Sequence, residues 1–124
     1  MFILCVDRDG IAGRKQQLEE IERQAARVLG ERSYLLAENA WQELEVWVLA
    51  GHELPMEWKW AGIRQESNPK ETYFLPFAKA RNVLQGPGEG RKTLALEAAK
   101  RYERIRRLCP EDIGELERRI KDLV

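Results

Sequence analysis

Several features that mark specialised classes of protein are scarce in this chain. Its 21 basic and 21 acidic residues cancel, so any attraction to nucleic acid or to an anionic membrane needs a local patch. No apolar run is long enough to cross a bilayer, and no charged leader precedes the first apolar residues. The two cysteines, Cys5 and Cys109, lack the number and spacing of a disulfide framework or a zinc site. We therefore expect a cytoplasmic protein that does not bind membranes.

The composition is that of a globular protein. Apolar residues make up 44% of the 124 residues and charged residues 34%, which is far from the composition of a disordered chain. A chain of this length holds one hydrophobic core. We therefore predict a single α/β domain over residues 1–124.

The N-terminal part of the sequence has the pattern of a βαβ unit. Phe2 to Val6 is a short apolar run, typical of a strand buried on both faces, and Tyr34 to Ala37 is a second one. Between them, Arg14 to Leu29 has apolar residues at helical spacing, and Gly30 follows as a stop signal. Because a helix joins the two strands, we expect them to pair in parallel.

The rest of the chain is predicted to be mainly helical. The apolar segment from Ala40 to Ala50 predicts a buried helix, and Pro76 fits the first turn of a helix that runs to Leu84. Thr93 to Leu108 predicts another helix, and Pro110 opens a last one. We expect these two to form a basic C-terminal helical hairpin.

Acidic residues stand at the end of the first predicted strand. Asp7 and Asp9 can offer hard oxygen ligands to magnesium or manganese, although an ordinary turn also favours Asp-x-Asp-Gly. Glu43 and Glu45 lie in the apolar segment, where a buried carboxylate must be paired, hydrogen-bonded or bound to metal. Their spacing places them about 200° apart on a helix, unless the helix is distorted or begins between them.

Several segments carry a family resemblance. They resemble the Toprim superfamily, in its branch of small, poorly characterised bacterial and archaeal proteins. The segments are Ile3–Gly10, Ala37–Glu38, Glu43–Ala50, Tyr73–Phe77, Gln85–Lys92 and Arg104–Pro110. The resemblance implies a small Toprim/Rossmann-like parallel sheet, and the C-terminal helical hairpin would follow it.

The resemblance also implies a protein or subunit that acts on nucleic acid with Mg²⁺, or Mn²⁺ in its place. Toprim domains bind the metal through an Asp-x-Asp pair, so Asp7 and Asp9 become metal residues, with Glu38 as a further ligand. Glu43 and Glu45 are then the assisting catalytic residues of a nuclease or phosphotransfer reaction. Toprim domains also use a glutamate on an earlier strand, which has no counterpart here. Two alternatives stay open: an upstream segment supplies it, or the chain is catalytically incomplete alone.

Positive charge is concentrated in the C-terminal third of the sequence. Between Arg91 and Arg107, seven basic residues stand against two acids, Glu97 and Glu103. We assign five of the basic residues to nucleic-acid binding: Arg91, Lys92, Lys100, Arg101 and Arg104. Their contacts would be with phosphates, salt-sensitive and independent of base sequence. The alternative is a solvated helix face.

A second hypothesis places the function in association with other proteins. Two clear strands make a thin sheet, and a bare sheet edge pairs readily with another chain. We therefore expect a homo-oligomer or a protein partner, and the alternative function is a non-catalytic interaction or oligomerisation module. Trp58 and Trp60 are candidate contact residues. All four tryptophans are expected in the core or an interface rather than in base stacking.

Overall fold

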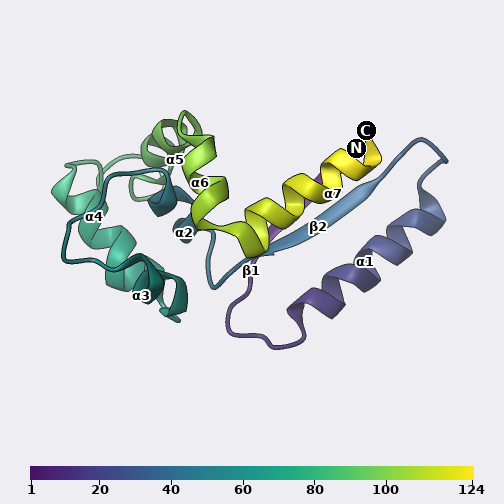
Figure 1. Ribbon diagram of the computed structural model, residues 1–124, viewed down its shortest axis with the longest axis horizontal. Coiled ribbons are helices and arrows are strands. Elements are labelled where there is room, and N and C mark those ends of the chain that lie inside the picture. Colours follow the sequence, from purple (N-terminus) through teal and green to yellow (C-terminus); the bar gives the residue numbers. More distant parts are fainter.

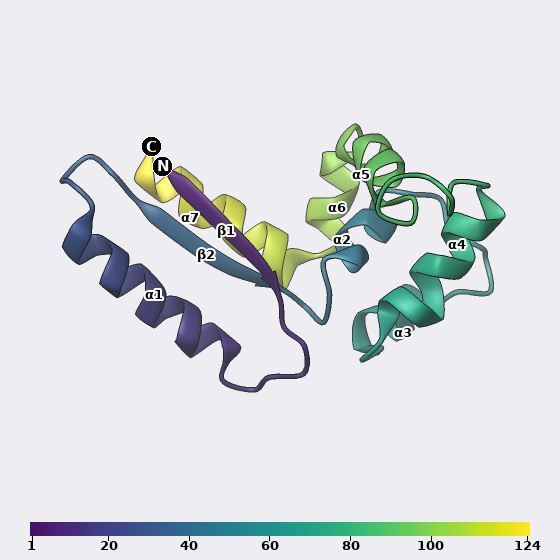
Figure 2. The same cartoon turned by 180° about the vertical axis from the view of Figure 1, so that it is seen from behind.

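The computed structural model describes residues 1–124 and has two parts (Figures 1 and 2). One part is a small sheet with two long helices, and it contains both ends of the chain. The other part is a group of short helices formed by the intervening residues. The elements are, in order, β1 (Phe2–Asp7), α1 (Arg14–Val28), β2 (Leu35–Ala40), α2 (Glu45–Ala50), α3 (Trp60–Gln65), the π-helical turn η1 (Lys70–Phe74), α4 (Leu75–Ala80), α5 (Arg91–Ala99), α6 (Tyr102–Leu108), the π-helical turn η2 (Pro110–Gly114) and α7 (Glu115–Leu123).

The predicted βαβ unit is confirmed. β1 and β2 pair in parallel, with Phe2 opposite Leu35 and Asp7 opposite Ala40, and α1 connects them. β2 extends beyond the predicted apolar run, because Glu38 continues its extended backbone. Glu38 therefore lies inside the sheet rather than after it.

Helix α7 departs from the predicted hairpin. The residues after Pro110 are helical as expected, but α7 runs along β2, so that β2 lies between α1 and α7 in both views (Figures 1 and 2). A sheet with few strands leaves the apolar residues of β2 to be covered, and α7 contributes the buried Leu116. The preceding helix is also divided, since Lys100 and Arg101 form a turn between α5 and α6. The predicted hairpin is therefore wrong.

Two other predicted helices have different bounds. The helix expected over Ala40–Ala50 begins at Glu45, and Gln42 before it has a left-handed φ of 73°. The helix expected to run to Leu84 ends at Ala80, because Asn82 has a left-handed φ of 57° that does not continue a helix. Both errors arise from single backbone conformations that apolar spacing does not report.

The larger hydrophobic core lies in the part made of short helices. Its buried side chains come from α2, α3, η1, α4 and α5: Val46, Leu49, Ile63, Phe74, Phe77, Ala78 and Leu94. Next to it, α2 and α5 pack so closely that a Cβ added at Gly51 would lie 2.5 Å from Ala98 Cβ. The sheet part buries only Leu18, Leu36, Ala37, Ala40 and Leu116 among its apolar residues. No helix in the molecule is both long enough and apolar enough to cross a membrane.

Candidate functional site

The two predicted metal residues at the end of β1 have different environments. Asp7 Oδ1 accepts a hydrogen bond from the backbone N–H of Leu44 at 2.7 Å, which ties the strand end to the segment before α2. Asp9 has a left-handed φ of 53° and lies 3.7 Å from Arg14, with 56% of its side chain exposed. Asp7 is thus partly used by the fold, whereas Asp9 is open to solvent.

The two glutamates assigned to catalysis lie at the start of α2. Glu45 is the first residue of the helix, and Glu43 lies two residues before it. Glu43 precedes the helix, and its Oε2 accepts a hydrogen bond from the backbone N–H of Lys70 at 3.1 Å. Burial raises the pKa of Glu43, and the nearby carboxylates of Glu45 and Asp7 raise it further. Glu45 is buried and forms an ion pair with Arg91 at 2.9 Å. Glu43 therefore binds a proton more readily than an exposed glutamate does.

Glu38, the further metal residue predicted from the sequence, lies among other charges. It is buried in β2, and its Oε2 lies 3.8 Å from Arg119. Burial raises its pKa, and the hydrogen bond from the Asn39 N–H together with the charges of Arg119 and Lys15 partly offsets this effect. Glu38 therefore interacts with α7 and α1.

The acids do not gather into a preformed metal cage. No group of three or more His, Cys, Asp or Glu side chains is arranged to hold a metal ion. Mg²⁺ often needs less, because it is commonly bound by one or two carboxylates together with the phosphates of a substrate. Asp7, through its free Oδ2, and the exposed Asp9 offer ligands of that kind. Mg²⁺ binding at these two residues stays a prediction, in which a phosphate of the substrate supplies further ligands.

The five basic residues assigned to nucleic acid are also divided by the structure. Arg91 is bound to Glu45, and Arg101 donates a hydrogen bond to the backbone carbonyl of Gly51 at 2.9 Å. Lys92 and Lys100 are exposed, and the fifth residue, Arg104, lines a hollow on α6. The positive patch of the sequence is thus not one surface, because two of its members hold the fold together.

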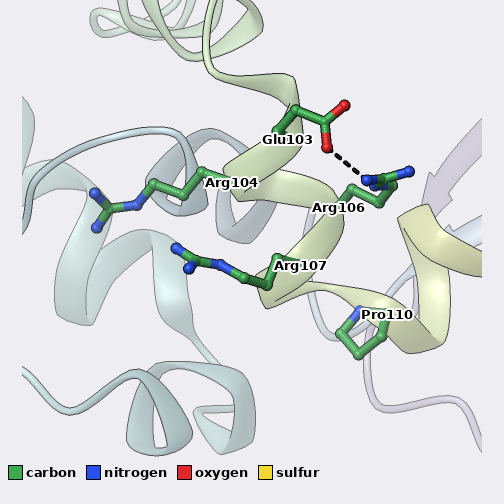
Figure 3. Close-up of a pocket in the computed structure, with 5 residues that line it drawn as sticks. All are labelled: Glu103, Arg104, Arg106, Arg107 and Pro110. Atoms are coloured by element: carbon green, nitrogen blue, oxygen red, sulfur yellow. Dashed lines mark hydrogen bonds and ion pairs between the residues drawn. The ribbon is translucent and has the colours of Figure 1, made fainter.

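The hollow on α6 has a volume of about 660 Å³ and contains three arginines. Figure 3 shows Arg106 turned toward Glu103, while Arg104 and Arg107 extend together from the other side of the helix. Arg104 Nε is buried without a hydrogen-bond partner, and neither Arg104 nor Arg107 has an ion pair. Two uncompensated guanidinium groups therefore face this hollow.

Two further hollows continue from this one toward the sheet. Arg107 and Pro110 also line a hollow of about 390 Å³ that reaches Trp60 and Trp41. Trp41 in turn lines a hollow of about 410 Å³ at the carboxyl ends of β1 and β2. Because each hollow shares residues with the next, they form one surface, which we call the basic track. Its basic and aromatic residues, apart from Arg64 and Arg106, which are paired with acids, are Arg104, Arg107, Trp60, Trp41, Arg8, Arg14 and Lys15. Arg14 forms an ion pair with Asp9 at 3.7 Å, and the acids Glu38, Glu103, Glu111 and Asp112 also line these hollows.

Trp41 lies at the centre of the basic track. The guanidinium groups of Arg8 and Arg64 each lie 5.4 Å from the centroid of its ring, and its side chain is exposed, unlike the partly buried Trp58 and Trp60. Arg64 is neutralised by Asp112 at 3.0 Å. Trp47, Trp58 and Trp60 pack against the core clusters of the helical part, as expected. Trp41 differs, because it is 38% exposed and has Arg8 and Arg64 over its ring.

The end of the basic track at α1 has an unusual charge. The helix begins with Arg14 and Lys15 and has no acidic residue in its first turn. Cations are unfavourable there, because the N-terminal end of a helix already carries partial positive charge. Together with Arg8 they concentrate positive charge beside the carboxyl ends of the strands, where ligands of parallel α/β sheets commonly bind.

Comparison with family models, with curated proteins and with solved structures found no match to this chain. The Toprim resemblance therefore still rests on the sequence motifs alone. The sequence analysis did not assign Arg8, Arg14, Lys15 or Trp41, which line the basic track, to a candidate site. A signal for the first three was present, because basic residues surround the Asp-x-Asp motif and open the helix that follows it.

Proposed function

We propose that the protein binds nucleic acid along the basic track and acts on it, as a Toprim-like protein or subunit, with Mg²⁺ at Asp7 and Asp9. The observation that carries the proposal is the continuity of the track, from Arg104 and Arg107 to the carboxyl ends of the strands. Lysine and arginine side chains that meet phosphates release the counterions of the nucleic acid, and Arg104 and Arg107 have no ion pair to break first. Trp41 is 38% exposed, and a base can stack on its ring in the place that the Arg8 guanidinium takes here.

The track favours single-stranded nucleic acid over a duplex. Trp41 lies between the arginines of α6 and those near α1, which is the alternation of aromatic and basic groups that single-strand binding uses. Stacking requires an unpaired base, and duplex phosphates alone would not need the ring. Binding is thus expected to be independent of base sequence and sensitive to salt.

The proposed reaction is a Mg²⁺-dependent nuclease or phosphotransfer step at the end of the track near β1. When bound, the metal would polarise a phosphoryl oxygen. Asp7 and Asp9 would hold it together with a phosphate of the substrate. Glu43 is the residue best suited to carry a proton there, because its pKa is raised by burial. The proposal includes a cytoplasmic location, where Cys5 and Cys109, which form no disulfide, would stay reduced.

The proposal is tested by reversing charge on the track. The double variant Arg104→Glu plus Arg107→Glu should weaken binding of a fluorescent single-stranded oligonucleotide, measured by anisotropy at several salt concentrations. The slope of log affinity against log salt should fall by about 0.7 for each phosphate that the variant protein no longer binds. The matched control, Arg27→Glu plus Arg32→Glu, makes the same change in net charge at exposed residues far from the track.

The outcomes separate specific from general electrostatics. Equal loss of affinity in both double variants would mean that only net charge matters, and the track would be rejected. Unchanged affinity in the track variant would reject it as well. The metal is tested in the same assay: Mg²⁺ should strengthen binding by the wild type, and this gain should vanish in Asp9→Asn but persist in Asp122→Asn.

A further inference from the structure

The two edges of the sheet differ, and the outer edge of β2 is closed. The N–H of Ala37 donates to Glu22 Oε1 at 2.6 Å, and the carbonyl of Ala37 accepts from Arg119 Nη1 at 3.1 Å. Glu22 on α1 and Arg119 on α7 also bind each other, with N–O distances of 2.6 and 2.7 Å. Side chains from both flanking helices thus satisfy the backbone of Ala37 at the middle of this edge, and a further strand would have to displace them.

The outer edge of β1 is open. The N–H of Phe2 donates to the carbonyl of Tyr34, so the even-numbered residues of β1 bond to β2. By the alternation of a parallel ladder, the N–H and C=O groups of Ile3 and Cys5 point away from β2. No other strand lies there, since the sheet consists of β1 and β2 alone. Backbone groups on this edge are therefore available to another strand.

The side chains of β1 lack the features that protect edge strands. Such strands usually carry lysine, proline or a bulge that prevents pairing with another molecule, and Phe2 to Val6 has none of these. The side chains of Met1, Phe2 and Ile3 are 50%, 58% and 49% exposed. β1 is thus an edge strand with the apolar sequence that is typical of a central strand.

We propose that β1 pairs with β1 of a second copy of this chain, antiparallel and centred on Leu4, to form a four-stranded sheet in the order β2–β1–β1–β2. A closed contact between two identical strands is related by a two-fold axis, and the two strands then run antiparallel. The unpaired backbone N–H and C=O groups on the β1 edge of each copy would find hydrogen-bond partners on the same edge of the other copy. The proposal concerns a surface away from the basic track and does not depend on nucleic-acid binding.

The register follows from matching apolar residues. Centred on Leu4, the pairing places Phe2 opposite Val6 and Ile3 opposite Cys5, and each pair is apolar. Ile3 and Cys5 carry the outward backbone groups, so they form the hydrogen-bonded pairs and Leu4 meets its own copy in a non-hydrogen-bonded pair. A shift of the centre to Cys5 would place Asp7 opposite Ile3. A shift to Ile3 would place Val6 beyond the β1 strand of the other copy, which starts at Phe2.

The first experiment measures the oligomeric state. Sedimentation equilibrium of the purified full chain over a wide concentration range should show a monomer–dimer equilibrium. Ile3→Lys adds a charge to each copy of the paired edge and should raise the dimer Kd by about tenfold or more. The matched control is Ile21→Lys, which makes the same change at a 40% exposed isoleucine of α1 and should leave the Kd unchanged.

The second experiment tests the register. In a Cys5→Ser background, Leu4→Cys places two thiols on the two-fold axis, where Cα atoms about 4.5 Å apart lie within reach of a disulfide. Mild oxidation should give a covalent dimer. Phe2→Cys in the same background should not, because its two copies are far apart along the strands. The buried Cys109 is present in both variants.

Each outcome decides the proposal. A chain that remains monomeric at all concentrations and does not cross-link overturns it, even if β1 then binds a strand from a different protein. A dimer that persists in Ile3→Lys, or that cross-links equally through Phe2→Cys, shows that the contact lies elsewhere or in another register.

Discussion

A buried carboxylate at position 112 accepts hydrogen bonds from three other segments of the chain. Asp112 Oδ2 receives the backbone N–H of Trp41 at 2.8 Å, the indole N–H of Trp47 at 2.7 Å and Arg64 Nη1 at 3.0 Å. The side chain is 3% exposed. Burial opposes the charge of Arg64, but the bonds to Asp112 outweigh this effect and raise the arginine pKa. One residue thus connects the sheet, α2, α3 and η2.

Replacing Asp112 by alanine should therefore be strongly destabilising. The change leaves the Arg64 guanidinium buried beside only the exposed Glu111, and breaking a buried pair costs about 3–5 kcal/mol. Urea unfolding followed by tryptophan fluorescence measures the loss. Asp122→Ala is the control, because its partner Arg118 is exposed on α7 and such pairs contribute about 0.3–0.5 kcal/mol. Similar losses in the two variants would contradict the role given to Asp112.

Single residues show how far sequence reasoning reaches at a site. The apolar surroundings of Glu45 correctly predicted that this buried acid has a partner. They did not predict that the partner is Arg91, which is distant in the chain. The alternative in which the helix begins between Glu43 and Glu45 is confirmed. Asp112 was missed entirely, because nothing in its local sequence indicates burial. The local sequence can show that a buried charged group needs a partner, whereas the tertiary fold determines which residue that partner is.

At the scale of elements, α6 and α7 are joined through one carboxylate. Glu117 on α7 accepts hydrogen bonds from Lys121, from Tyr102 at 2.8 Å and from Arg106 at 3.1 Å. These bonds, with that from Lys121 the largest, lower the pKa of Glu117 from 4.5 to about 2. Because α7 also covers β2, this carboxylate helps to connect the helical part to the sheet part.

The lowered pKa of Glu117 predicts the direction of an acid effect. A carboxylate with a lower pKa in the folded state than in the unfolded state stabilises the fold above about pH 4.5, and this stabilisation disappears as the pH falls toward 2. The wild type should therefore be more stable than Glu117→Gln at pH 7, and the difference should shrink at pH 3. Thermal unfolding at both pH values measures it. Glu103→Gln, at a far more exposed partner of Arg106, should show little difference at either pH.

Elements defined by local pattern were predicted better than their packing. The spacing of apolar residues and the stop signal at Gly30 predicted β1, α1 and the parallel pairing of the strands. All three are confirmed. The place of α7 was predicted wrongly, because its amphipathic pattern fits any apolar surface. Only the complete fold shows that the apolar residues of β2 would be exposed without a helix packed against them. The basic track was hidden for the same reason, since it combines residues from α6, α3 and the segments around β1.

At the scale of the whole molecule, burial is unevenly distributed. The two contiguous clusters of buried apolar residues both lie between Val46 and Cys109, in the helical part. The sheet part has few buried apolar residues, and β1 has apolar side chains on a surface that neither α1 nor α7 covers well. A two-stranded sheet with so little burial is marginally stable. The sheet part is thus expected to open more readily than the helical part.

This difference leads to a prediction about hydrogen exchange. In a monomer, the outward N–H groups of Ile3 and Cys5 have no acceptor and should exchange quickly with solvent. In the proposed dimer they bond to the second copy, so their exchange should slow as protein concentration rises, as mass action requires. Amides of α2, which lies in the helical core, should show no such dependence, because they are already protected in the monomer. Residue-resolved exchange by NMR at two concentrations measures both groups, with Ile3→Lys as the variant in which the dependence should disappear. Rates at Ile3 and Cys5 that stay the same at both concentrations would show that the open edge of β1 is left unpaired, and the stability of the sheet part would then rest on α1, α7 and the Glu22–Arg119 pair alone.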